Sequence, residues 1–85
     1  MTVARVASSA SSTVLLAAGN ERNNVIIENS DANRLHVILD SAAAAVDSYS
    51  FSLAQNETAR IYEYAGEIRG IWAADGSGYA HITTY

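Results

Sequence analysis

The sequence predicts one small all-β domain, an antiparallel β-sandwich or barrel of jelly-roll-like type with about eight short strands. Three observations support this fold class. The chain has 85 residues, which is enough for one domain but not for two. Runs in which apolar and polar residues alternate recur along it, as expected of strands that bury one face. Clusters of Gly, Asn, Asp and Ser separate these runs at intervals of roughly 8–12 residues.

Four strands are expected in the first half of the chain. Residues 3–7 and 13–17 give the weaker signals, each a short run with a few β-branched or aliphatic side chains. Residues 25–27 are all β-branched and are bounded on both sides by asparagines, which favour turns. Residues 35–39 alternate leucine and valine with polar side chains, although Ile38 places one apolar group on the second face.

Four more strands are expected in the second half. Residues 49–53 show the clearest alternation, because tyrosine, phenylalanine and leucine are each separated by a serine. Residues 58–62 alternate in the same way, and residues 68–73 and 79–85 supply two further runs. The turn sequence Asp75–Gly78 predicts that the last two strands form a hairpin. The pattern does not give the order of strands in a sheet.

The alternation also predicts which side chains face the core. Truncating Phe51, one of these residues, to Ala is expected to cost about 3–5 kcal/mol of stability. For a chain that buries only about 60–65% of its unfolded surface, that loss is large. The predicted core residues are Val25, Ile27, Leu35, Val37, Leu39, Phe51, Leu53, Ile61, Ile68, Trp72 and Ile82.

Two segments are open to more than one interpretation. Residues 41–46 are alanine-rich and compatible with a helix, but six residues are too few for a stable one, so we expect a loop, a single helical turn or disorder. Residues 1–12 are mostly small and include only Val3 and Val6 as anchors. We expect this segment to be an extended N-terminal arm that a neighbour orders, with an ordinary first strand of the same domain as the alternative. Gly70, inside a strand, is expected to mark a close approach between strands.

The charge balance argues against nucleic acid as a partner. The chain has five Arg, no Lys and nine acidic residues, for a net charge of −4, and its arginines are scattered. Binding to phosphates requires a basic face, which this pattern does not predict. The apolar run Val14–Ala18 is too short for a secretory signal, and no run approaches the roughly 20 residues of a membrane span. We therefore expect no membrane partner.

The sequence does not group side chains into a chemical site. His36 and His81 are the only histidines, with Asp40 or Asp47 as conceivable partners in a metal site. A zinc site usually needs three or four clustered ligands, so polar positions on the outer faces of strands are the simpler interpretation. No G-x-S-x-G elbow occurs. We expect no catalytic residues, no metal and no cofactor.

The aromatic residues allow one alternative function. Aromatic faces can stack on sugar rings, so a carbohydrate-binding platform is conceivable. Aromatic residues are also common in strands, cores and interfaces, which is the stronger expectation. The residues concerned are Tyr62, Tyr64, Trp72, Tyr79 and Tyr85.

The run Gly66–Trp72 reads G-x-I-x-G-I-W and is followed by small residues, glycines and a final strand. Together with the order of the other features from Ser12 to Tyr85, this run resembles a group of small virion structural proteins of tailed bacteriophages, and it is the most specific part of the resemblance. The chain departs from that group at one point. The group often has a proline before the tyrosine-rich strand, whereas this chain has no proline.

The resemblance implies a capsid cement or decoration protein on the outer surface of a head shell. Such a protein is not an enzyme and carries no catalytic residues. Its implied partners are the major capsid protein and further copies of itself, with a trimer expected first and a dimer second. A head–tail connector or tail component is the alternative within the virion, and a carbohydrate-binding module is the alternative from another class.

Overall fold

A computed structural model describes residues 2–18, 24–39, 49–62, 64 and 66–84 of the chain. The predicted helix-compatible stretch 41–46 and the side chains of Asp40, Asp47 and Tyr85 lie outside the described residues. The described residues form eight strands and no helix. The strands are β1 (Thr2–Ala7), β2 (Thr13–Leu16), β3 (Asn24–Asn29), β4 (Leu35–Ile38), β5 (Phe51–Leu53), β6 (Thr58–Tyr62), β7 (Ile68–Trp72) and β8 (Tyr79–Thr84).

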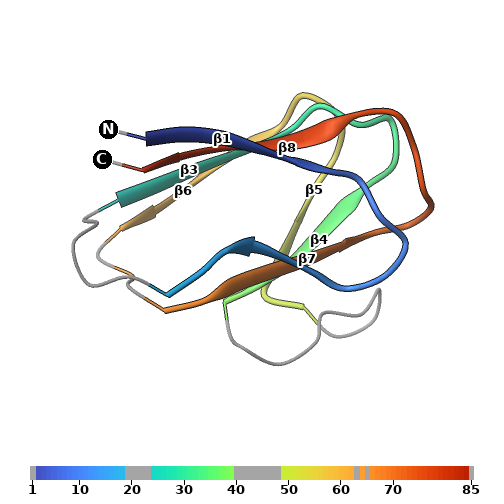
Figure 1. Cartoon of the computed structure of the whole chain (residues 1–85). Helices are drawn as coiled ribbons and strands as arrows, with labels where there is room; N and C mark the ends of the chain where they lie inside the picture. The colour runs from blue at the N-terminus through green and yellow to red at the C-terminus, as the bar shows by residue number, and fades with distance from the viewer. Residues whose placement is uncertain (1, 19–23, 40–48, 63, 65, 85) are drawn as a thin grey trace.

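The strands form two antiparallel sheets that face each other (Figure 1). Sheet A has the order β1-β8-β3-β6 and sheet B the order β2-β7-β4-β5. Within them β1 pairs with β8, β2 with β7, β3 with β6 and β4 with β5, as in one long antiparallel ribbon folded over on itself. This eight-stranded arrangement is a jelly roll, so the predicted fold class is confirmed.

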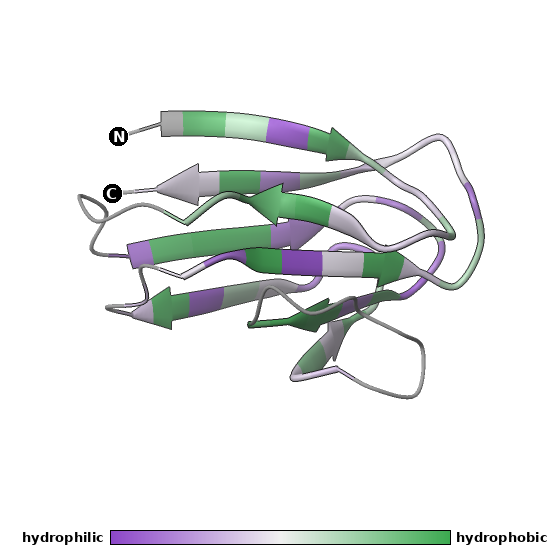
Figure 2. Ribbon diagram, turned by 60° about the horizontal axis from the view of Figure 1, so that its bottom comes forward, coloured by the Kyte–Doolittle hydropathy of each residue, from purple (hydrophilic) through white to green (hydrophobic). Residues whose placement is uncertain are grey.

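The core lies between the sheets and follows the period-two pattern of the strands. Hydrophobic and hydrophilic residues alternate along several strands (Figure 2). In β7, for example, Ile68, Gly70 and Trp72 are buried while the residues between them are partly exposed. The buried apolar residues are Leu15, Val25, Ile27, Leu35, Val37, Leu53, Ile61, Ile68, Trp72, Ala80 and Ile82.

Nine of the eleven predicted core residues are buried, and two are not. Leu39 and Phe51 are only partly buried, although both pack against the core. Phe51 begins β5, a three-residue strand at the edge of sheet B, and Leu39 follows the last residue of β4. A residue on an edge strand, such as Phe51, or beyond the end of a strand, such as Leu39, has fewer neighbours than one in the middle of a sheet, so alternation alone overstates its burial.

The predicted hairpin at Asp75–Gly78 is wrong. The connection from β7 to β8 crosses from sheet B to sheet A, so the two strands do not pair. The tight two-residue hairpin turns need positive φ angles, and no described glycine has one. The loop amides bind elsewhere: Gly78 N donates to Asp31 Oδ2, and Gly76 N donates to Ser8 Oγ.

The N-terminal arm is also corrected for the residues that the structure describes. Thr2–Ala7 forms β1, which pairs in unbroken antiparallel register with β8 of the same chain, so the alternative of a first strand is the one found. The ladder to β8 supplies the backbone hydrogen bonds that the isolated segment lacks, and the partly buried Val6 packs against the core. β1 is an edge strand of sheet A.

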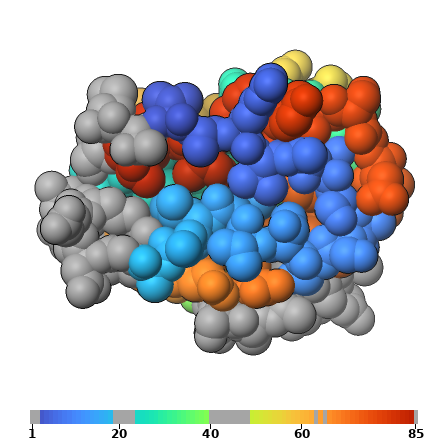
Figure 3. Space-filling model, viewed as in Figure 1, coloured from blue at the N-terminus to red at the C-terminus, as the bar shows by residue number. Residues whose placement is uncertain are grey.

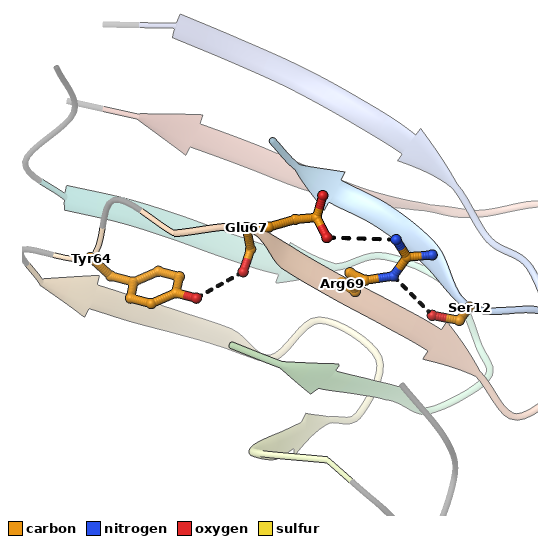
Figure 4. Close-up of polar contacts among 4 residues, drawn as sticks. All are labelled: Ser12, Tyr64, Glu67 and Arg69. Atoms are coloured by element: carbon orange, nitrogen blue, oxygen red, sulfur yellow. Dashed lines mark hydrogen bonds and ion pairs between the residues drawn. The ribbon is translucent and has the colours of Figure 1, made fainter. Parts of the chain in front are cut away.

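The run Gly66–Trp72 has a packing explanation. A Cβ on Gly66 would come within 2.5 Å of the Tyr64 hydroxyl oxygen, so glycine leaves room for the end of the Tyr64 side chain. The Tyr64 hydroxyl donates a hydrogen bond to Glu67 O at 2.9 Å (Figure 4). A Cβ on Gly70 would lie 2.8 Å from Leu15 Cδ1. The close approach predicted at Gly70 is therefore confirmed.

Polar side chains support the same run on its outer side. Arg69, which follows Ile68 in β7, lies with Nη1 3.6 Å from Glu67 Oε2 and donates through Nε to Ser12 Oγ at 3.3 Å (Figure 4). These contacts tie the start of β7 to the segment before β2. Each is a partly exposed contact that contributes modestly to stability.

Candidate functional site

A buried asparagine joins the two sheets at one end of the sandwich. Asn29, the last residue of β3, is fully buried. Its Oδ1 accepts hydrogen bonds from Trp72 Nε1 at 3.0 Å and from Asp31 N at 3.0 Å. Its Nδ2 donates to Asn33 O at 2.9 Å and to Leu53 O at 3.0 Å. All four hydrogen-bonding positions of the amide are therefore used within the fold.

Asp31 is a buried carboxylate with a complete set of donors. Its Oδ1 accepts from Asn33 N at 2.7 Å and Asn33 Nδ2 at 2.9 Å, and its Oδ2 accepts from Gly78 N at 2.8 Å. Burial alone would raise the pKa of Asp31. The hydrogen bonds from the Asn33 amide, the Ser8 hydroxyl, Gly78 N and the Asn33 side chain outweigh that effect and lower the pKa. Asp31 is thus a structural anion.

Further hydrogen bonds join the loops at this end. Ser8 Oγ accepts from Gly76 N at 3.1 Å, and Ala10 N donates to Asp75 Oδ1 at 2.7 Å. The β1–β2 and β7–β8 connections are therefore fixed to each other. The sequence pattern does not predict this network, because Asn29 and Asp31 are residue types typical of turns. One sequence signal does point to Asn29: it lies two residues after Ile27 and four after Val25, so it continues their alternation of inward-facing positions.

The two histidines lie on different sheets and do not meet. His36 is in β4 between the inward-facing Leu35 and Val37, so its side chain lies on the outer side of sheet B. It is nonetheless 9% exposed, with the Tyr49 ring 4.6 Å away between centroids. Burial, and secondarily the charge of Arg34, lowers the pKa of His36. The outer-face position is as predicted, but the side chain is not solvated.

His81 lies on the outer side of sheet A in β8. Its Nε2 is 3.2 Å from Ser30 Oγ, and its ring is 6.3 Å from that of Tyr79, over which the Arg5 guanidinium sits at 4.5 Å. Among the described residues, no three His, Asp or Glu side chains gather closely enough to hold a metal ion. The aspartates proposed as metal partners, Asp40 and Asp47, lie outside the described residues.

The predicted aromatic platform is not assembled. Trp72 is fully buried and bonded to Asn29, so its ring cannot stack on a sugar. Tyr62 is 65% exposed on the outer side of β6, whereas Tyr79 lies on β8 beneath Arg5. Tyr64 is directed to Glu67, and Tyr85 lies outside the described residues.

The outer side of sheet A gathers the most exposed large side chains. Val3 is 68% exposed and Tyr62 is 65% exposed, at opposite edges of the sheet. We call this surface the sheet A face. Sequence reasoning did not single it out, although the outward positions of the expected strands 3–7 and 58–62 identify part of it. Its residues are Val3, Arg5, Ile26, Glu28, Arg60, Tyr62, Tyr79, His81 and Thr83.

The comparisons with known proteins leave the chain without an assigned relative. No protein-family model matches it, and no curated protein or solved structure is significantly similar to it. The described residues contain no helix long and apolar enough to cross a membrane.

Proposed function

We propose that this chain is a non-enzymatic structural protein of a tailed-bacteriophage virion, a capsid cement or decoration protein that stabilises the head shell. It would act by surface contacts with the major capsid protein at the seams between capsomers. Many weak contacts on one particle act together, so modest individual affinity is sufficient.

The observation that carries the proposal is the composition of the sheet A face. Tyrosine and arginine are enriched in protein interfaces, and this face presents Tyr62, Tyr79, Arg5 and Arg60 together with the exposed Val3. It has two arginines and one glutamate among its residues, whereas the whole chain has a net charge of −4. A partly apolar partner surface with acidic groups would complement it.

The interior supports a structural role as well. The two most deeply buried polar side chains, Asn29 and Asp31, are bonded to other parts of the fold rather than directed at a surface. The whole chain exposes 4599 Å², close to the roughly 4,850 Å² expected of a monomeric domain of its mass. The chain therefore buries as much surface as a monomeric domain of its mass and does not need a partner for that reason. The proposal depends on the sheet A face instead.

The test is binding of the purified full chain to head shells that lack it, measured by co-sedimentation. Tyr62→Ser and Arg60→Glu should each reduce binding at least tenfold, because both change the sheet A face. Arg34→Glu is the matched control, since it makes the same charge change beside sheet B, where Arg34 Nε donates to Ser52 Oγ. Equal binding by all variants, or no binding by the wild type, would contradict the proposal. Binding confined to the portal or tail would favour the connector alternative.

A further inference from the structure

The edge of sheet A at β1 is the least protected strand edge in the described fold. Natural sheets shield their edges with short strands, bulges, lysines or prolines. Of the other edge strands, β5 has three residues and β2 has four with an irregular register between Val14 and Leu16. β6 has five residues. β1 has six residues in unbroken register and carries Val3, which is 68% exposed.

One backbone hydrogen bond shows which residues of β1 bond to β8 and which face the open edge of the sheet. Ser8 N donates to Gly78 O at 3.1 Å, which continues the register of β1 with β8 by one residue. Bonded pairs in an antiparallel ladder recur at every second residue. The even-numbered residues of β1 therefore bond to β8, while Val3, Arg5 and Ala7 direct their N–H and C=O groups to the open edge. Residues of β1 lie at the molecular surface (Figure 3).

We propose that this edge pairs with β1 of a second copy of the chain, antiparallel and about a two-fold axis at Ala4. The two A sheets then form one continuous eight-stranded sheet. The proposal deepens the proposed function, because it names the surface through which two copies of the chain contact each other. The biological role of this dimer rests on the proposed function, whereas the test of the dimer does not. It differs from the trimer that the resemblance implies.

The charge pattern of β1 selects the partner and the register. With the axis at Ala4, Val3 of each copy lies opposite Arg5 of the other, and the open-edge donors and acceptors of both strands meet in phase. Moving the axis to Arg5 would place two like charges directly opposite each other, which is unfavourable. Shifting the pairing of the two β1 strands by one residue would place inward-facing side chains of one copy beside outward-facing side chains of the other. Two in-phase registers pair five residues of each β1, with the axis at Ala4 or at Arg5, and only the axis at Ala4 keeps the two arginines apart.

A cysteine at the axis tests the register. The chain has no cysteine, so a disulfide from a single Cys can form only between copies. Facing residues of a non-bonded antiparallel pair have Cα atoms about 4.5 Å apart, within the disulfide range. Ala4→Cys should give a covalent dimer under mild oxidation. In the same register the Cα atoms of two Arg5 residues lie about 8 Å apart, so the control Arg5→Cys should not. Failure of Ala4→Cys to cross-link, or equal cross-linking of Arg5→Cys, would overturn the proposal.

Sedimentation equilibrium of the free chain provides a second test. The wild type should form a dimer of two 9.0 kDa chains. Arg5→Pro removes an open-edge N–H without removing a bond to β8, and should raise the dimer dissociation constant at least tenfold. Thr58→Pro, at the first residue of the β6 edge, is the matched control and should leave that constant unchanged. Because oligomerisation follows mass action, a wild-type chain that is still a monomer at about 100 µM, or that forms a trimer, would contradict the proposal. A dimer that does not bind shells would contradict the proposed function instead.

Discussion

Replacing Asn29 by Ala should destabilise the fold far more than its polar side chain suggests. The side chain makes four hydrogen bonds: to Trp72 Nε1, Asp31 N, Asn33 O and Leu53 O. At about 0.5–1.5 kcal/mol for each bond, the loss is about 2–6 kcal/mol. The total stability expected of 85 residues is about 4–13 kcal/mol, so one substitution removes a large part of it.

Urea unfolding, followed by circular dichroism and by the fluorescence of Trp72, the single tryptophan, measures this loss. Asn33→Ala is the matched control, because its side chain makes one hydrogen bond, to Asp31 Oδ1, and its removal should cost about 1 kcal/mol. A cost below about 1 kcal/mol for Asn29→Ala would refute the idea that this amide holds the two sheets together. In a double-mutant cycle, Trp72→Phe should show coupling to Asn29→Ala.

The remaining predictions concern acid, packing and the sheet edge. Burial lowers the pKa of His36, so the unfolded chain binds more protons and stability should fall as the pH drops below about 6.5. The pKa of Asp31 is lower in the folded chain than in the unfolded chain, so Asp31 contributes stability above about pH 3.9 that is lost as the pH falls through the folded pKa. Urea unfolding measured from pH 8 to 3 should show the loss of stability from His36 and then the loss from Asp31. A stability that does not change with pH would contradict both predictions. Gly70→Ala should cost about 1–3 kcal/mol by overpacking, seen as a lower Tm, and an unchanged Tm would argue against the close approach. Phe51→Ala should cost less than the roughly 3–5 kcal/mol of Trp72→Ala, because Phe51 lies at a sheet edge; equal losses in urea unfolding would place Phe51 in the core.

The sequence predicted the strands well because inward positions are apolar at every second residue. It predicted the buried state of Val25, Ile27 and Ile68 for that reason. Leu15 was missed because both of its neighbours, Val14 and Leu16, are apolar, so the run has no clear phase.

Connections between sheets were harder to predict than strands. The glycines of Asp75–Gly78 correctly indicate a break between two strands, but the composition of a connection does not say whether the next strand stays in the same sheet. The path of this connection depends on residues far away in the sequence, such as Asp31 and Ser8, which accept hydrogen bonds from the backbone N–H groups of the loop. Long-range hydrogen bonds of this kind leave no local pattern in the sequence.

The candidate surface shows the same limit. Alternation places Arg60 and Tyr62 on an outer face, but it does not reveal that β1, from the other end of the chain, lies in the same sheet. The jelly-roll order brings these edge strands into one sheet. The pairing of β1 with β8, of β8 with β3 and of β3 with β6 makes the sheet A face a continuous surface.

The most direct test of the proposed structural role is the copy number of this chain in purified particles of the tailed phage that the proposed function requires, measured by quantitative mass spectrometry. A shell cement protein occupies repeated sites, so the account predicts many copies, on the order of hundreds per particle. A cryo-EM map of the same particles should place them on the outside of the shell. Absence of the chain from the particles would contradict the proposed function, and about a dozen copies or fewer would assign it to the connector or tail instead.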